Sequence, residues 1–415
     1  MSSTNTKTSL DTMFKYKVAK KVNNLVPSHA IIQKLVPKLS EAEKTGRKYL
    51  CPVALTLENG VTYGDGSAFS YESDVAGVYD EIEIDSNPIV LRSRVSLAAA
   101  NRMASNEQAF ITKMSLQSGN MKESLVKRYE IECLYGKTGL GKISGNPVVD
   151  TGPTPDQTTI TFTDATWSPG IWGGLEGSLL ECRNAGSLVN TNADMTLVSV
   201  DVDNKAIVVS GDNTDLTALA DTYDIFFKGA YANSFHGIDY QLTNTGTLFG
   251  ISAATYNLWK ANTYAVGGQL TMSKVLKGVA KAVGKGGLSE EAVLLVPALG
   301  YEGLNSDISA LRDFDSSYKS GSADIGVSSI NYYAQSGKIK IVAHPFLKEG
   351  EAMLVPVSAM KRVGASEIQF GFGGDEYFEK LEGSAGYQLL AQGDWCVLID
   401  APAKCVKYTG ITHAA

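Results

Sequence analysis

A clear alternation of apolar and polar residues runs between residues 50 and 94. It is strongest in two runs, VALTL at 53–57 and EIEID at 81–85, which are separated by Gly60, Gly64, Gly66 and Gly77. Because a period of two is the pattern of β-strands, the segment predicts a long two-stranded β-hairpin. An isolated two-stranded hairpin is only marginally stable in water, so this one is expected to pack on another surface.

A helical pattern follows the hairpin. Ser105 and Gln108 have the spacing of a capping box at its start, and Gly136 follows Tyr135 at its end. A helix of about thirty residues is on the order of 45 Å long, which is unusual for a globular core. Apolar residues of this helix recur at intervals of four and seven and define its expected packing face: Phe110, Met114, Met121, Leu125, Tyr129 and Cys133.

Short β-type runs fill residues 148–240. They lie at 159–163, 197–202 and 206–209, and a tight turn is expected at 203–205. We interpret the whole segment as an inserted β-rich subdomain.

The remaining chain mixes helical and strand patterns. A continuous apolar run at 292–296 predicts a buried central strand. The alternation of helices and strands around it predicts an α+β lobe with a mixed sheet. Helices are expected at 253–261 and 273–283, and further strands at 338–343, 353–356 and 395–399.

Charge is distributed unevenly, although the net charge of the 415 residues is only −7. Residues 1–48 contain ten Lys or Arg and three acids, and Pro27 and Pro37 interrupt their weak helical signals, which predicts an extended arm. Residues 51–85 contain eight acids and no Lys or Arg. The candidate contact residues are Lys15, Lys17, Lys20 and Lys21 in the basic arm and Glu58, Asp65, Glu72, Asp74, Asp80 and Glu81 in the acidic hairpin.

The two segments of opposite charge can pair within one chain or between chains of an assembly. The arm lysines can also neutralise DNA phosphates. No nucleic-acid-binding fold signature accompanies them, so sequence-specific readout is not expected, and contact with an acidic protein surface is favoured.

The nearest match to a catalytic motif is GKTGLGK at 136–142, which fits the first seven positions of the P-loop GxxxxGK. The eighth position should be Ser or Thr and is Ile143, and the stretch follows a helix where a P-loop opens one. A glycine-rich helix exit is therefore favoured over nucleotide binding. Glycines at 170–177 and 371–374 are interpreted as turns beside aromatic residues, and Asp203 and Asp212 as solvated turn carboxylates.

Few sequence patterns typical of disulfide, metal-binding or catalytic sites occur in the chain. The five cysteines are scattered without a CxxC pair, which predicts reduced, buried thiols, and the four histidines lack metal-ligand spacing. No GxSxG or HExxH occurs, and neither a secretory signal nor a membrane helix is apparent. No catalytic, cofactor-binding or metal-binding residue is therefore expected, and no contact with a membrane.

The order of these parts resembles the major capsid proteins of tailed bacteriophages, which have the Hong Kong 97-type fold. The matching parts are the basic arm at 1–48, the acidic hairpin at 49–91 and the long helix at 106–135, called the spine helix in that family. The glycine-rich stretch at 135–143 looks like the family's helix exit. The run GTLFGIS at 246–252, followed by Tyr256 and Trp259, looks like the passage into the shell-forming axial domain.

The resemblance implies a division of the chain into six parts: an N-terminal arm (1–48), an extended hairpin loop (49–91), a peripheral domain with the spine helix (92–147), a β-rich insertion or further peripheral strands (148–240), an axial domain with a mixed sheet (241–390) and a C-terminal return strand (391–415). It further implies a structural protein without enzymatic activity. Such a protein assembles into hexamers and pentamers of an icosahedral shell around double-stranded DNA.

The partners implied by the resemblance are further copies of the chain, a separate scaffolding protein, a portal and a decoration protein. The shell would be assembled in the host cytoplasm and become the virion capsid. Two alternatives stay open. An encapsulin-type compartment shares the fold and would have a cargo partner, and a cytosolic nucleotide-dependent enzyme would need a pocket with a perturbed titratable group.

Overall fold

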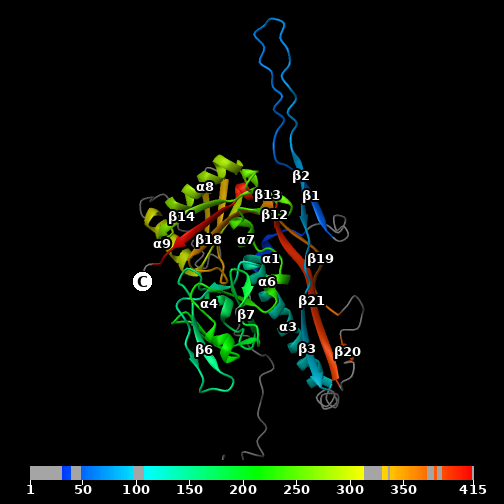
Figure 1. Cartoon of the computed structure of the whole chain (residues 1–415), viewed down its shortest axis with the longest axis vertical. Helices are drawn as coiled ribbons and strands as arrows, with labels where there is room; N and C mark the ends of the chain where they lie inside the picture. Colours follow the sequence, from blue (N-terminus) through cyan, green and yellow to red (C-terminus); the bar gives the residue numbers. More distant parts are fainter. Residues whose placement is uncertain are drawn as a thin grey trace, which may run out of the picture.

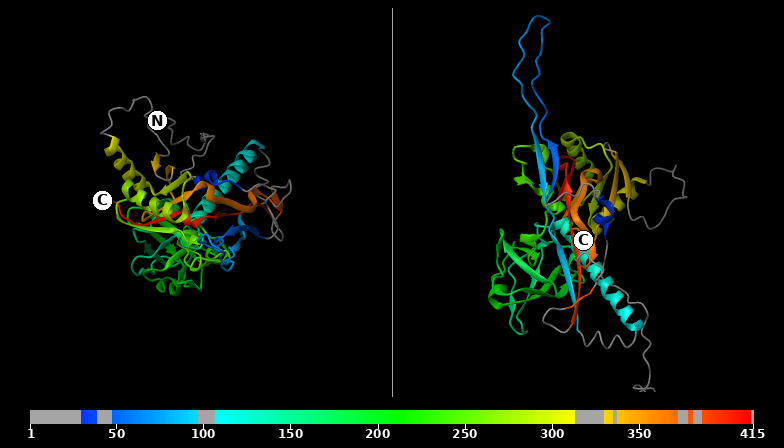
Figure 2. Two further views of the ribbon diagram at one scale, coloured as in Figure 1. Left: turned by 90° about the horizontal axis from the view of Figure 1, so that it is seen from above. Right: turned by 90° about the vertical axis from the view of Figure 1, so that its right-hand side faces the viewer.

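The computed structural model describes residues 30–38, 48–96, 107–312, 330–334, 337–371, 378–380 and 386–413. They form three larger sheets around one long helix, and a hairpin that projects far from this body (Figures 1 and 2). The α+β class predicted from the sequence is confirmed.

The projecting hairpin grows out of two paired strands, β1 (Tyr49–Ala54) and β2 (Tyr79–Ile84), which are antiparallel. Residues 55–78 run out and back between them (Figure 1). At its base, Ile82 and Ile84 are buried, and β2 contacts a second small hairpin made of β12 (Thr247–Leu248) and β13 (Ile251–Ser252). The β-hairpin expected from the alternating pattern is confirmed.

The long helix α3 (Glu107–Tyr135) is continuous over 29 residues and passes through Gly119. It ends at Tyr135 as predicted, whereas the capping box at Ser105 lies outside the described residues. The short helix α1 (Ile31–Leu35) packs against it.

A four-stranded antiparallel sheet lies along the spine helix. Its longest strand, β21 (Gly386–Ile399), pairs along one edge with β3 (Ile89–Ser96) and along the other with β19 (Met360–Phe370) and β20 (Phe378–Lys380). This sheet therefore joins the segment just before α3 to β19 and β20, which the expected boundaries place in the axial domain, and to β21, which crosses the expected boundary between the axial domain and the return strand at 390/391. These segments meet because β21 pairs with β19 along one edge and with β3 along the other.

The predicted mixed sheet has six strands in the order β14-β22-β18-β15-β17-β16. Strand β15 is buried throughout, parallel to β17 and antiparallel to β18, as its continuous apolar run predicts. Helices α8 (Met272–Gly286) and α9 (Ala298–Arg312) accompany this sheet. The strands are β14 (Asn262–Gly268), β15 (Ala292–Val296), β16 (Ile330–Ala334), β17 (Gly337–Ala343), β18 (Glu351–Pro356) and β22 (Val406–Ile411).

One predicted helix is wrong. Residues 253–261 contain only the single 3-10 turn Asn257–Trp259. Local hydrogen bonds hold the turn, from the Tyr256 N–H to the Ser252 carbonyl (2.9 Å) and from the Trp259 N–H to the Tyr256 carbonyl (2.9 Å). The Trp259 indole is buried and donates to the Leu248 carbonyl at 3.1 Å, so packing of this side chain overrides the helical pattern.

The β-rich segment forms an eight-stranded sheet in the order β4-β11-β7-β9-β10-β6-β5, with β8 paired to β7; its edge strand β4 comes from residues 141–142, before the boundary predicted at 148. The predicted runs correspond to β6, β9 and β10, and the last two are joined by a turn at 202–205. The strands are β4 (Gly141–Lys142), β5 (Val149–Asp150), β6 (Gln157–Thr161), β7 (Leu179–Asn184), β8 (Ser187–Leu188), β9 (Met195–Asp201), β10 (Ala206–Ser210) and β11 (Asp224–Phe227), and the short helices are α4 (Pro169–Trp172), α5 (Asn213–Thr217), α6 (Ala230–Asn233) and α7 (Ile238–Thr243).

Candidate intersubunit surfaces

The projecting hairpin exposes apolar side chains that its own subunit does not cover. Every residue from 57 to 80 is exposed except Thr62 and Gly77, which are half-buried. Tyr63 is 93% exposed and Tyr71 is 88% exposed. The large exposed apolar residues of the hairpin are Leu57, Val61, Tyr63, Phe69, Tyr71, Val75, Val78 and Tyr79. An exposed array of apolar side chains is typical of interaction surfaces.

Few hydrogen bonds hold the hairpin together. The Leu55 N–H donates to the Val78 carbonyl (2.8 Å), and the Asn59 N–H donates to the Val75 carbonyl (2.9 Å). The Val78 N–H donates to the Thr56 hydroxyl (2.8 Å) where a regular ladder would use a backbone carbonyl. Strand pairing therefore ends at Ala54, short of the strand predicted at 53–57. That the segment beyond it packs on a partner surface stays a prediction.

All six candidate acids of the hairpin, Glu58, Asp65, Glu72, Asp74, Asp80 and Glu81, are exposed. Hydrogen bonds from the hydroxyl and the backbone of Ser67 lower the pKa of Asp65. The hairpin therefore presents a negatively charged surface at neutral pH.

The proposed basic partner, the arm at 1–48, is described only at residues 30–38 and at Lys48. Lys15, Lys17, Lys20 and Lys21 lie outside the described residues, so their pairing with the hairpin stays a prediction. Lys48, the last residue of the arm, does contact the acidic segment, because its Nζ lies 2.5 Å from Oε2 of Glu83 at the hairpin base.

The spine helix places its predicted apolar face on the four-stranded sheet. Met121 and Leu125 pack against Leu389 and Ala391 of β21. Tyr129 stacks on Trp395 with ring centroids 4.8 Å apart. The side chains of Phe110 and Met114 lie outside the described residues.

Sequence reasoning missed the buried charges on the same helix. Three charged residues that lie between the apolar positions in the sequence are also buried: Lys127, Glu130 and Glu132. Oε1 of Glu130 lies 3.2 Å from Nε2 of His344 and also accepts the Ile32 N–H. Burial raises the pKa of Glu132, whose carboxylate accepts from the Ser234 hydroxyl. These groups tie the helix to α1, to the β-rich subdomain and to the loop after β17.

A second buried cluster lies where the end of the spine helix meets the mixed sheet. Nζ of Lys407 bonds the Asp239 carboxylate and lies 3.4 Å from Glu351. Burial, reinforced by the negative charge of Asp239, raises the pKa of Glu351 to about 7. Nζ of Lys348 donates to the Gly139 carbonyl (2.9 Å) and sits 4.1 Å from the Tyr135 ring centroid. No local sequence pattern indicates this cluster, because its residues are far apart in the sequence.

The P-loop-like stretch at 136–142 forms the exit of the spine helix, as predicted. The Gly136 N–H donates to the Glu132 carbonyl (2.7 Å), the Thr138 N–H to Tyr135 (2.9 Å) and the Leu140 N–H to Ile225 (2.7 Å). The chain then enters β4, so it runs from helix to strand. These amides are directed into the protein, in contrast to those of a phosphate-binding loop.

The other glycine-rich stretch, at 170–177, was predicted as turns; its first residues belong to the short helix α4, and turns follow at 173–174 and 176–177. Trp167 and Trp172 pack on Phe162, with ring centroids 5.7 and 5.0 Å away. The Asp212 side chain caps α5 by accepting from the Thr214 N–H, and Asp203 is exposed. Most of the cluster at 371–374 lies outside the described residues.

The described residues include five free cysteines and no metal-binding cluster. They contain no group of three or more His, Cys, Asp or Glu side chains able to hold a metal ion. The five cysteines are free; Cys51 is half-buried and the other four are buried. Burial raises the pKa of Cys182 to about 12 and that of Cys133, Cys396 and Cys405 well above the usual range, which keeps these thiols protonated. Of the helices that the structure describes, none has the length and apolar character required to cross a membrane.

Comparison with known proteins gives structural matches only. No family model and no curated protein sequence matches the chain. The cyanophage A-1(L) capsid asymmetric unit matches with a TM-score of 0.57 and 10% identity over 99% of this chain and 100% of that chain. The capsid of the native GTA particle matches with a TM-score of 0.53 and 6% identity over 99% and 100%. The chain therefore has the tailed-phage major capsid fold that its sequence resembles.

Proposed function

We propose that this chain is a structural major capsid protein, which assembles into hexamers and pentamers of an icosahedral shell enclosing phage double-stranded DNA. The observation that carries the proposal is the hairpin at 55–78, which projects from the body with exposed apolar and acidic side chains (Figure 1). Ordering such a segment costs conformational entropy, which burial against a neighbouring subunit offsets. A closed shell gives every copy such a neighbour.

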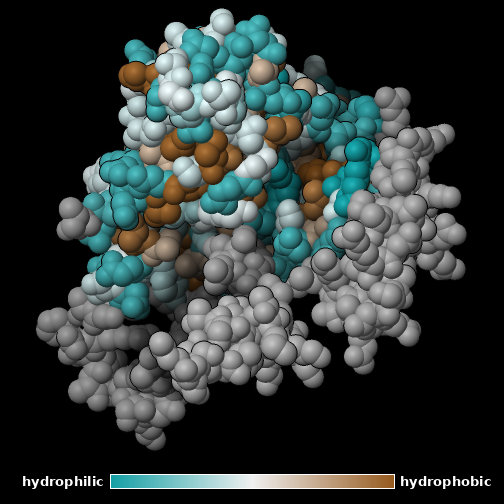
Figure 3. Space-filling model, turned by 90° about the horizontal axis from the view of Figure 1, so that it is seen from below, coloured by the Kyte–Doolittle hydropathy of each residue, from teal (hydrophilic) through white to brown (hydrophobic). Residues whose placement is uncertain are grey.

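The fold supports the same role. Its body packs on one long helix whose last residues, from Tyr129 to Tyr135, are buried in a core shared with three sheets, which suits a unit that tiles a shell. Apolar residues also reach the surface on the face seen from below, between hydrophilic areas (Figure 3). Contacts between copies would cover such patches in an assembly.

We further propose a separate scaffolding protein, a portal and a decoration protein as partners, assembly in the host cytoplasm, and contact with DNA that does not depend on its sequence. The basic arm supports the last point because lysines neutralise phosphates without reading bases. The six-part division into arm, hairpin, peripheral domain, insertion, axial domain and return strand is part of this proposal.

Electron microscopy of the purified chain tests the proposal. The heavy fraction from size-exclusion chromatography should contain hexameric or pentameric rings, or closed shells. High salt should loosen them, because screening weakens contacts between exposed charges. A uniform monomer or dimer at every salt concentration and at high protein concentration would contradict the proposal. Shells that co-purify with a protein cargo would favour the encapsulin-type alternative.

A further inference from the structure

Four lysines lie along one side of helix α8, which packs on the mixed sheet at the top left of the body in Figure 1. The helix contains no acidic residue. Intervals of three, four and four residues bring the lysines to within about 80° of one another around the helix and spread them over about 16 Å of its axis. We call these residues the lysine stripe: Lys274, Lys277, Lys281 and Lys285.

The exposed side of α8 carries only lysines and small residues. Val275 and Val279 are buried against the mixed sheet on the opposite side of the helix. Besides lysines, the exposed residues of α8 are Ser273, Ala280 and Gly284. These short side chains leave the ammonium groups open to the approach of a large partner.

Hydrogen bonds fix the ammonium groups of the stripe without neutralising them. Three of these groups donate to backbone carbonyls: Lys274 to Gln269 (2.9 Å), Lys281 to Thr263 (3.0 Å) and Lys285 to Lys260 (2.5 Å). An ammonium group has three donors, so two remain at each of these lysines. Lys277 is exposed and bonds no other described residue. Burial, together with the charge of Lys260, lowers the pKa of Lys285, as expected where cations gather without an anion.

The acids of the chain pair with other lysines. Nζ of Lys205 lies 2.7 Å from the Asp164 carboxylate, for example. None of the ion pairs between described residues involves the lysine stripe. Asp307 does contact α8, but its carboxylate accepts the Met272 N–H at the start of the helix (2.8 Å). The positive charge of the stripe is therefore left for a partner outside the subunit.

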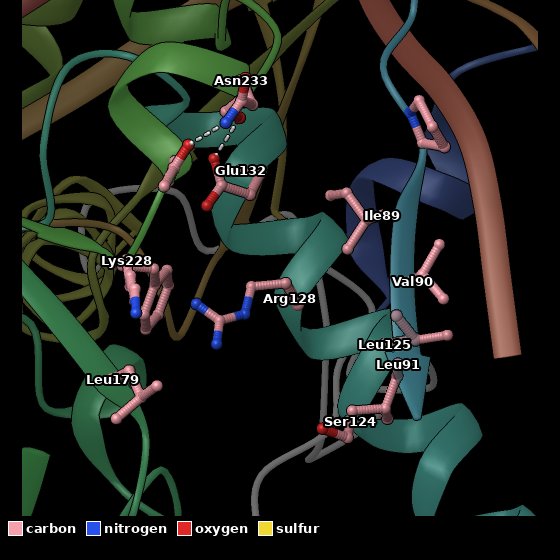
Figure 4. A pocket seen from close by; sticks show the side chains of 15 residues that line it. Ile89, Val90, Leu91, Ser124, Leu125, Arg128, Glu132, Leu179, Lys228 and Asn233 are labelled. Carbon is pink, nitrogen blue, oxygen red and sulfur yellow. Dashed lines mark hydrogen bonds between the residues drawn. The ribbon is translucent and has the colours of Figure 1, made fainter. Parts of the chain in front are cut away.

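The cations beside the spine helix differ from the stripe in this respect. Figure 4 shows Arg128 reaching from α3 towards Lys228, with Glu132 one turn further along the helix. Lys228 pairs with the Asp194 carboxylate (2.5 Å). The charge of Glu132 favours the charged form of Arg128 and so opposes the effect of burial, which lowers the pKa of this guanidinium to about 10. These two cations have acidic neighbours within their own subunit.

The composition of the exposed side of α8 favours nucleic acid over protein as the partner. Interfaces between proteins are enriched in aromatic residues, Met and Arg, and depleted in Lys, Ser and Ala. The exposed side of α8 consists of the depleted kinds and glycine. Lysine side chains do contact the phosphates of nucleic acids, and these contacts carry no sequence information. The length of the stripe corresponds to roughly five base pairs of B-DNA.

We propose that the lysine stripe of α8 binds the phosphate backbone of double-stranded DNA without regard to its sequence. The inference rests on the proposed function and adds a contact surface for the enclosed DNA, separate from the basic arm.

The salt dependence of DNA binding tests the proposal. Fluorescence anisotropy of a labelled duplex of about 20 base pairs would measure the affinity of the full-length, unassembled chain between about 50 and 200 mM salt. Each neutralised phosphate contributes about 0.9 to the slope of log K against log salt concentration. Replacing all four stripe lysines with Gln should therefore make the slope shallower by about 3–4, equally on two duplexes of unrelated sequence.

A matched control removes the same number of charges elsewhere. It combines substitutions at four lysines that each pair with an acid and whose side chains are 38–51% exposed: Lys142→Gln, Lys205→Gln, Lys228→Gln and Lys338→Gln. This variant should change the slope by less than about 1. Lys277→Gln alone keeps the test valid if the fourfold stripe variant does not fold. It should make the slope shallower by about 1 and leave the midpoint of urea unfolding unchanged.

Several results would overturn the inference. They are absence of DNA binding by the wild type, a wild-type slope in Lys277→Gln or in the folded stripe variant, and equal losses in the stripe and control variants. Loss of binding only after Lys15→Gln, Lys17→Gln, Lys20→Gln and Lys21→Gln would assign DNA to the basic arm instead. Poly-glutamate that binds the stripe more tightly than the duplex does would assign the stripe to an acidic protein.

The proposed function fails or stands separately. The stripe variant should still form the rings or shells of the wild type, since the substitutions leave the hairpin intact. Wild-type slopes in variants that form shells would overturn only the DNA contact. Absence of rings and shells from the wild type would overturn the capsid role, whatever the DNA titrations show.

Discussion

At the residue scale, we expect one tyrosine to contribute to the stability of the folded subunit and another to its assembly. Tyr129 is fully buried between Trp395 and Phe235, whereas Tyr63 is 93% exposed on the hairpin. We expect Tyr129→Ala to lower the free energy of unfolding by about 3–5 kcal/mol, the cost of a large cavity in a core. Tyr63→Ala should change it by less than about 0.5 kcal/mol and impair assembly instead. Denaturant unfolding of the unassembled subunit measures the first effect, and light scattering the second. Similar losses of stability in both variants would contradict this assignment.

A histidine beside the small hairpin of β12 and β13 gives a pH-dependent prediction. Burial, with a smaller effect of the Lys137 charge, lowers the pKa of His236 to about 4, and the ring packs between Tyr240 and Phe249. Since the folded-state pKa lies below the unfolded value of about 6.5, this stabilisation is present above pH 6.5 and is lost as pH falls towards 4. His236→Phe keeps an aromatic ring, so its melting temperature should fall less than that of the wild type between pH 7 and pH 4.5. Calorimetry at both pH values measures this difference. An equal fall in melting temperature for the two proteins would contradict the assignment.

The buried charges mark the limit of what residue patterns predict. The apolar face of the spine helix followed from its periodicity, but nothing in that pattern indicated that Lys127, Glu130 and Glu132 are buried. Their partners are remote in sequence: Ser234 is 102 residues from Glu132, and His344 is 214 residues from Glu130. No local pattern signals such a partner, because burial here depends on how the three sheets close around the helix.

At the scale of elements, a glycine in the middle of the spine helix and the glycine that follows its end have opposite tolerance for a methyl group. A Cβ at Gly119 meets nothing within 4 Å, whereas a Cβ at Gly136 collides with the Phe235 carbonyl and lies 2.7 Å from the Glu132 carbonyl. We expect Gly119→Ala to stabilise the subunit by about 0.5–1 kcal/mol and Gly136→Ala to destabilise it by about 1–3 kcal/mol. Opposite shifts in the midpoint of urea unfolding would show this. Destabilisation by Gly119→Ala would indicate a contact that the described residues do not show.

Elements with strong local periodicity were predicted well, and their long-range pairing was not. The hairpin, the end of the spine helix and the buried strand β15 all followed from residue patterns. The pairing of β3 with β21 did not, because these strands are almost 300 residues apart and their register depends on the sheet already formed by β19 and β21. The predicted helix at 253–261 failed for a related reason, since the buried Trp259 holds the chain in a turn.

At the scale of the whole molecule, the body and the hairpin have separate roles. The body contains a continuous core that includes residues of all three larger sheets, whereas the segment at 57–80 contributes no buried residue. Folding of the subunit should therefore not require the hairpin, and assembly should. The sequence predicted the hairpin, and its need for a partner surface stays a prediction, whereas the packing of α3 against the β-rich subdomain became visible only in the structure.

The most direct test replaces residues 55–78 with an Asn-Gly turn, which suits a two-residue connection between β1 and β2. Light scattering coupled to size-exclusion chromatography would compare this variant with the wild type over a range of protein concentrations. Our account predicts a folded variant with an unchanged unfolding transition that stays a single subunit or a small oligomer, while the wild type forms rings or shells. Shells of wild-type size and stability from the shortened variant would contradict the central role of the hairpin in assembly.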